Sequence, residues 1–127
     1  MEETLTFEET LQKIRDNDPD VLEVSFYNQN ISDQGCIDFV TAMINNTVVN
    51  SVSLGSNNIT DIGAEHLANM LRTNSTLESL YLHENNIQDS TLALHSAFND
   101  NTSLKKLYLH GNKVRGIIFY LILGVQK

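Results

Sequence analysis

Two histidines occupy the same place in two nearly identical phrases of the sequence, LESLYLHENNI (77–87) and LKKLYLHGNKV (104–114). A pair of imidazoles, here His83 and His110, can hold a metal ion when a third ligand lies nearby, or transfer protons when a pocket and a pKa-tuned partner are present. Glu84 is the one further candidate ligand near them, and Cys36, the only cysteine, lies elsewhere in the repeat pattern. We therefore expect no metal site, no catalytic residue and no cofactor, and we predict that the protein is not an enzyme.

The repeated phrase belongs to a longer periodic pattern. Strand-like phrases begin near residues 21, 49, 77 and 104, and each carries apolar residues at offsets 0, 3, 5 and 10 from its first residue. The alternation within each phrase predicts a short strand with one buried face.

An asparagine recurs at offset 8 of three phrases, and the first phrase has Gln29 there: Asn57, Asn85 and Asn112. A buried side-chain amide can bond the backbone groups of the turn that leaves each strand, and an unpaired group there would cost about 1–3 kcal/mol. We therefore predict that these three residues form a structural ladder between units.

Helical phrases separate the strands. Their apolar residues recur at spacings of three and four, as in Leu67 and Leu71, which places them on one stripe facing the strands. Asp33 and Asp61 precede two of these stripes, where a carboxylate favours a helix N-terminus.

The pattern L-x-x-L-x-L-x-x-N-x-L resembles the leucine-rich repeat, whose units bury their apolar side only against their neighbours. Units of this length with helices resemble the ribonuclease-inhibitor-like subclass, found also in Ran GTPase-activating protein, NOD-like receptors and tropomodulin. The resemblance covers residues 5–114, and it implies an α/β fold: a right-handed solenoid with short parallel strands on the concave face and helices on the convex face. We assign residues 1–114 to this leucine-rich repeat domain.

The beginning of the chain is typical of a solenoid cap. We predict a capping helix over residues 5–18, because Thr6 and Glu9 have the spacing of a capping box. Such a lone helix would cover the open side of the first strand. The phrase IRDNDPDVLEV (14–24) resembles the start of the tropomodulin repeat domain.

The end of the chain departs from the repeat. Residues 115–127 form an atypical apolar tail that includes GIIFYLILGV (116–125). This run is shorter than the ~20 residues that a membrane span needs, so we do not expect a membrane partner. The tail could cover the core of the last unit or anchor a partner.

Side chains on the concave face of neighbouring units align in columns, since adjacent parallel strands lie about 4.8 Å apart. The third and fourth units bring aromatic, imidazole and charged groups together there, whereas the first two offer mostly serine and glycine. Exposed tyrosines are effective anchors of protein interfaces, with incidental surface as the alternative. We predict that a partner binds at Tyr81, His83, Glu84, Lys106, Tyr108 and His110.

The net charge of the protein limits which class of partner it can bind. The net charge is −8, which argues against nucleic acid, where a basic face is needed. An acidic N-terminus without an apolar segment, together with a single cysteine, favours the reducing cytoplasm.

We predict a protein-interaction module; the alternative is a tropomodulin-like regulator of the pointed end of actin filaments. A GTPase-activating role would need a catalytic arginine, and no arginine here can be assigned to it.

Overall fold

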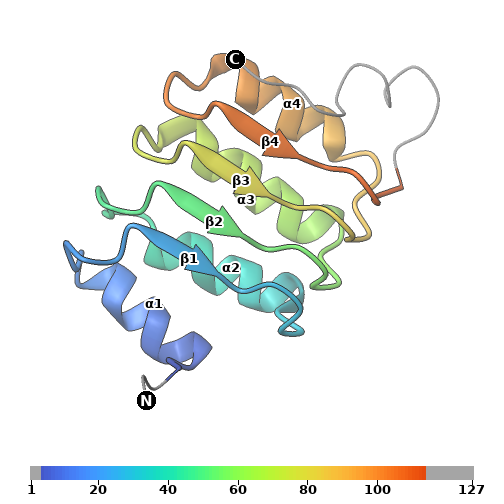
Figure 1. Ribbon diagram of the computed structural model, residues 1–127. Coiled ribbons are helices and arrows are strands. Elements are labelled where there is room, and N and C mark those ends of the chain that lie inside the picture. Colours follow the sequence, from blue (N-terminus) through green and yellow to red (C-terminus); the bar gives the residue numbers. More distant parts are fainter. Residues whose placement is uncertain (1–3, 114–127) are drawn as a thin grey trace.

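Strands and helices alternate along the chain in the computed structural model, which describes residues 4–113 (Figure 1). The tail predicted over residues 115–127 lies outside the described residues. The described elements are, in chain order, α1 (Phe7–Arg15), β1 (Glu23–Ser25), α2 (Ser32–Ala42), β2 (Ser51–Ser53), α3 (Asp61–Thr73), β3 (Ser79–Tyr81), α4 (Thr91–Asp100) and β4 (Lys106–Tyr108).

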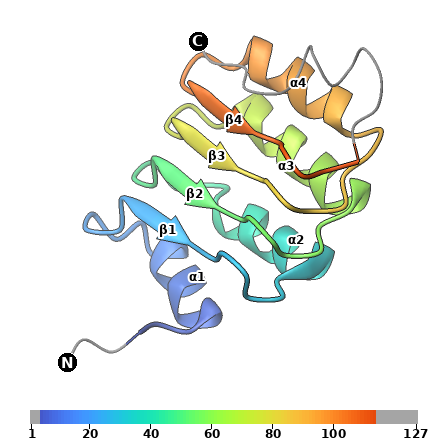
Figure 2. The same cartoon turned by 45° about the vertical axis from the view of Figure 1, so that its right-hand side comes forward.

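The strands form a parallel sheet in the order β1-β2-β3-β4, with the helices in a second layer on one of its faces (Figures 1 and 2). The central residues of the four strands pair in register: Val24, Val52, Leu80 and Leu107. These residues share one offset in the repeat, so the spacing of 28, 28 and 27 residues becomes one strand-and-helix unit per repeat. The leucine-rich repeat solenoid expected from the sequence is confirmed.

The hydrophobic core lies between the sheet and the helical layer. Val52 and Leu80 from the strands, and Leu67 and Phe98 from the helices, all have exposed fractions of 0%. Each strand and helix therefore contributes one apolar face, which stays dry only because the next unit covers it. Among residues 4–113, no helix is both long enough and apolar enough to cross a membrane.

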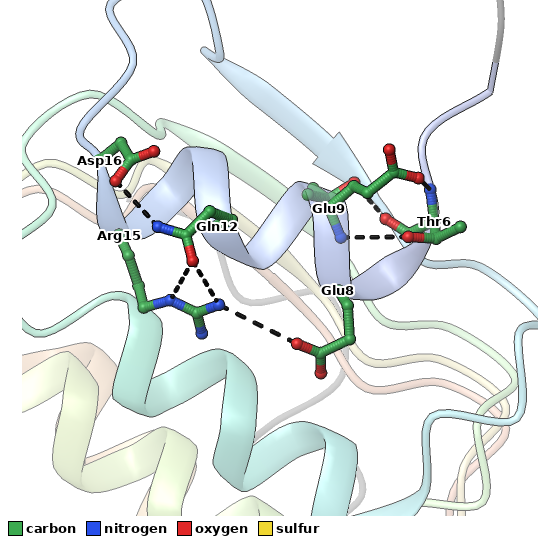
Figure 3. Close-up of polar contacts among 7 residues, drawn as sticks. Thr6, Glu8, Glu9, Gln12, Arg15 and Asp16 are labelled. Atoms are coloured by element: carbon green, nitrogen blue, oxygen red, sulfur yellow. Dashed lines mark hydrogen bonds and ion pairs between the residues drawn. The ribbon is translucent and has the colours of Figure 1, made fainter.

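The first helix is stabilised by its own polar side chains. The Thr6 hydroxyl accepts a hydrogen bond from the backbone N–H of Glu9, and the Glu9 carboxylate accepts one from the N–H of Thr6, both at 3.1 Å (Figure 3). Gln12 bridges Arg15 and Asp16 at the other end of the helix (Figure 3). The solvent-facing side of α1 is therefore polar, as the end of a solenoid requires.

The inner side of α1 closes the core at the first unit. Leu11 and Ile14 are fully buried, and α1 packs beside α2. The ring of Phe7 meets the ring of Phe26 edge to face, with centroids 4.9 Å apart. The sequence led us to expect a helix that covers the open side of the first strand. Instead, α1 extends the helical layer, and the backbone edge of β1 is left beside a groove.

The two predicted capping aspartates act on the next helix rather than on their own. The Asp33 carboxylate accepts hydrogen bonds from the backbone N–H groups of Thr60 (2.8 Å) and Gly63 (3.0 Å), at the start of α3. Asp61 does the same for Gln88 and Ser90, just before α4. Each carboxylate thus crosses to the neighbouring unit and binds backbone N–H groups where the next helix begins, and for Asp33 these include the first-turn N–H of Gly63.

A second asparagine series follows the helices. The Asn101 amide donates to the carbonyl oxygen of Leu71 (2.6 Å) in the preceding unit, and its oxygen accepts from the N–H groups of Ser103 and Leu104. Asn46 makes the equivalent bonds near the start of the solenoid. Its amide donates to the carbonyl oxygen of Ile14, and its oxygen accepts from the N–H groups of Val48 and Val49. Sequence reasoning missed this role, although the recurrence of asparagine at residues 46, 74 and 101 was the signal.

Candidate interaction surface

The asparagine ladder lies in the turns that follow the strands. The Asn85 oxygen accepts from the N–H groups of Asn57 (2.9 Å) and Ile59 (3.0 Å), and its amide donates to the carbonyls of Leu54 (3.0 Å) and Leu82 (3.1 Å). Its side chain therefore satisfies the turns of two successive units at once. Because these bonds are internal and Asn85 is buried, it supplies no group to a ligand.

Asn57 and Asn112 occupy the equivalent places on either side. Asn57 accepts from the N–H groups of Gln29 and Ile31, and Asn112 accepts from that of Ile87. Each amide bonds backward to the preceding unit, which is why the first phrase can carry glutamine at this offset without breaking the ladder.

Two tyrosines lie side by side on the concave face, the sheet face turned away from the helices. Tyr81 on β3 and Tyr108 on β4 are register partners, and their rings stack with centroids 4.9 Å apart and planes within 3°. Both side chains are partly buried. Each ring therefore restrains the rotamers open to the other.

A row of rings runs beside the tyrosines. His83 and His110 stack with centroids 5.0 Å apart, and Tyr27 stacks on the other side of His83 at 5.7 Å. Tyr27 comes from the first unit and reaches His83 because the unit between them has Gly55 in the same column. The row of rings therefore includes Tyr27, which lies outside the patch predicted from the sequence.

The environment of His83 favours its neutral form. Its pKa is lowered, first by burial and then by the neighbouring imidazole of His110, while the carboxylate of Glu84 acts in the opposite direction. Its Nδ1 atom is buried and has no hydrogen-bond partner in the described part of the chain. A neutral ring can lie flat in the row without placing an unpaired charge there.

The two charged candidates lie at the margins. Glu84 follows β3, and its carboxylate lies over Gly111 of the next unit, whose positive φ of 73° suits glycine. Lys106, on β4, lines a polar hollow of about 450 Å³ that it shares with Tyr81. The structure thus brings the tyrosines together and the histidines together, with Lys106 and Glu84 on different sides of them.

The residues around these rings form neither a metal cluster nor a reactive thiol in the described part of the chain. Residues 4–113 contain no group of three or more His, Cys, Asp or Glu side chains placed to hold a metal ion. Burial raises the pKa of the Cys36 thiol to about 12, and its sulfur lies 3.5 Å from the carbonyl oxygen of Gly63. Cys36 is therefore a core residue held as a neutral thiol. The described residues thus form a leucine-rich repeat module whose open sheet face carries two stacked ring pairs.

Comparison with known proteins identifies the family. The profile described as the TMOD/LMOD leucine-rich domain matches residues 3–116, so the chain belongs to this family. A solved structure of leiomodin-1 actin-binding site 2 is 31% identical, with a TM-score of 0.85, and the match covers 94% of this chain and 72% of that one. The tropomodulin C-terminal domain of Caenorhabditis elegans shares the fold at 16% identity and a TM-score of 0.66, over 89% of this chain and 84% of that one. A comparison with curated proteins gave no match.

The comparisons favour the alternative of the two functions considered from the sequence. The tropomodulin and leiomodin leucine-rich domain is a protein-interaction domain and not an enzyme family. Similarity to NOD-like receptors and Ran GTPase-activating protein finds no support among these matches.

Proposed function

We propose that this protein binds actin through its leucine-rich repeat domain. Membership of the TMOD/LMOD leucine-rich domain family carries the proposal, and a structure named as an actin-binding site of leiomodin-1 supports it at 31% identity. The finer form of the proposal is that the protein regulates the pointed end of actin filaments. It places the protein in the cytoplasm, where actin filaments are found, and assigns it no catalytic activity. We also assign the repeats to the ribonuclease-inhibitor-like subclass, because their length and helices are typical of it.

We further propose that the partner docks on the concave patch, defined as Tyr81, His83, Glu84, Lys106, Tyr108 and His110. The stacked tyrosines support this choice, because large rings already held in one geometry lose little freedom on binding. Ring rows of this kind also offer a flat apolar area with hydroxyl and imidazole groups at its margin. Such anchors dominate the binding energy of many interfaces.

Binding to purified monomeric actin tests both parts. Tyr81→Ala/Tyr108→Ala should weaken binding at least about tenfold, since an interface anchor contributes about 2 kcal/mol or more. Ser51→Ala/Ser53→Ala is the matched control on the same face, and it should change affinity by less than about twofold. Circular dichroism would first establish that both variants are folded.

The two parts of the proposal fail in different ways. If the wild-type protein does not bind actin, the actin proposal is wrong. If wild type and the tyrosine double variant bind equally well, actin is a partner but the concave patch is not its site. For the finer form, filaments with blocked barbed ends should elongate at an altered rate when the protein is present, and an unchanged rate would contradict pointed-end regulation.

A further inference from the structure

In the described part of the chain, β1 is the end strand of the sheet, and no strand lies beside its outer edge. Just beyond β1, the N–H groups of Phe26 and Asn28 donate to the carbonyl oxygens of Ser53 and Gly55 in the second unit. In a parallel sheet the alternate residues direct their backbone groups to the other side. Ser25 and Tyr27 therefore point their N–H groups outward, to the edge that no strand among residues 4–113 pairs with.

A groove lies next to this free edge. It has a volume of about 320 Å³ and is lined by residues of α1, β1 and the segments beside them, including Phe7, Val24 and Phe26. Figure 2 shows β1 at the end of the sheet with α1 beside it. A strand added to this edge would alternate its side chains, so that every second one would enter the groove and the others would face solvent.

The charge of the groove indicates which charge a ligand should carry. Asp20 and Glu23 are among the described lining residues, and no lysine, arginine or histidine is. The nearby Lys13 pairs with Asp18 at 3.5 Å, outside the lining set. A ligand with positive groups beside its apolar residues would therefore complement the groove, whereas an acidic one would be repelled.

We propose that the outer edge of β1 is a second docking site, which takes an extended segment of a partner protein by strand addition. The segment carries two apolar side chains two residues apart, which enter the groove beside Phe7 and Phe26, with lysine or arginine next to them. The site differs from the concave patch because it uses the backbone edge of β1, although Glu23 lines both this groove and the hollow beside Lys106.

A designed peptide, Lys-Thr-Leu-Thr-Leu-Thr-Lys with blocked ends, is a suitable probe. On binding, the amide protons of Ser25 and Tyr27 should become protected from hydrogen exchange. A version that is N-methylated at the alternate amides facing β1 should not bind, because it lacks the donors that pair with the strand edge. A version with glutamate in place of lysine should bind at least about fivefold more weakly.

Two variants of the protein separate backbone pairing from charge. Ser25→Pro removes an outward N–H at an edge where proline is tolerated, and it should abolish binding, whereas Ser25→Ala keeps that N–H and should bind as wild type does. Glu23→Lys should weaken binding of the basic peptide about fivefold. If Ser25→Pro does not fold, the Glu23→Lys variant and the N-methylated peptide still decide the question.

Three outcomes would overturn the proposal. The first is equal binding of the N-methylated and unmodified peptides. The second is protection of the Ser25 and Tyr27 amides in the free protein at low concentration, which would mean that the chain covers its own edge. The third is protection that rises with protein concentration alone, together with a dimer in sedimentation, which would make a second copy the occupant.

Discussion

The imidazole of His83 lies over the backbone of Gly55, so closely that a Cβ on Gly55 would come within 2.6 Å of its Cε1 atom. Glycine in the second unit thus leaves the space that a ring from the third unit fills. The same space lets His83 stack between Tyr27 and His110. One missing side chain therefore connects rings from three units.

Gly55→Ala should displace the His83 ring from this row. We expect the pKa of His83 to rise toward its ordinary value, because the displaced ring loses both its burial and its contact with His110. The cost in stability should be about 1 kcal/mol, the low end for overpacking, since the ring is the far end of a side chain and can swing away. NMR titration of the imidazole measures the first effect and urea unfolding the second. An unchanged His83 pKa would contradict the packing described.

Acid should weaken the fold through His83. Its folded-state pKa lies below the ordinary value of 6.5, so between the two values the unfolded chain binds more protons than the folded one. The stability that this ring contributes is therefore fully present above pH 6.5 and is lost as the pH falls through the folded-state pKa. In urea unfolding at several pH values, His83→Gln should lose less stability on acidification than wild type.

His66→Gln is the matched control for this titration, since His66 is an exposed residue of α3. That variant should keep the wild-type loss of stability, because the ring of His83 is still present. Identical acid sensitivity of wild type and His83→Gln would show that His83 does not contribute.

Asn85→Ala should cost far more stability than Asn86→Ala. The first substitution leaves the N–H groups of Asn57 and Ile59 and the carbonyl of Leu54 without their partner, and each buried unpaired group costs about 1–3 kcal/mol. Asn86 bonds the neighbouring unit through its backbone N–H, which alanine retains. The free energy of unfolding of Asn86→Ala should therefore lie within about 0.5 kcal/mol of the wild-type value. Thermal melts that rank the two the other way would mean that the ladder is assigned to the wrong residue.

Asp33→Ala should loosen the start of α3 rather than that of α2. Loss of its bonds to Thr60 and Gly63 should cost about 0.5–2 kcal/mol, as removal of a helix cap does. Hydrogen exchange would locate the effect: the first-turn amides of α3 should exchange faster. Asp38→Ala is the control, because Asp38 is described in a hydrogen bond only with the nearby Gln34. Faster exchange confined to α2 would contradict the capping of the next helix.

Much of the fold could be predicted from spacing. The pairing of Val52 with Leu80, and of Tyr81 with Tyr108, follows from residues at equal offsets in successive units. Each unit can bury its apolar side only against the next, so a repeated phrase stacks in register or not at all. The Thr6 and Glu9 capping box is equally local, and its residues are three apart.

The sequence by itself determined which residues lie within a unit and which residues align between units, because both depend on the backbone repeat. Only the tertiary structure decided which side chains cross from one unit to the next. Asp33 caps α3, Tyr27 reaches His83 over Gly55, and no strand within residues 4–113 pairs with the outer edge of β1. All three depend on the distance and rotation between neighbouring units. Those quantities arise from packing the whole core, and no short stretch of sequence contains them.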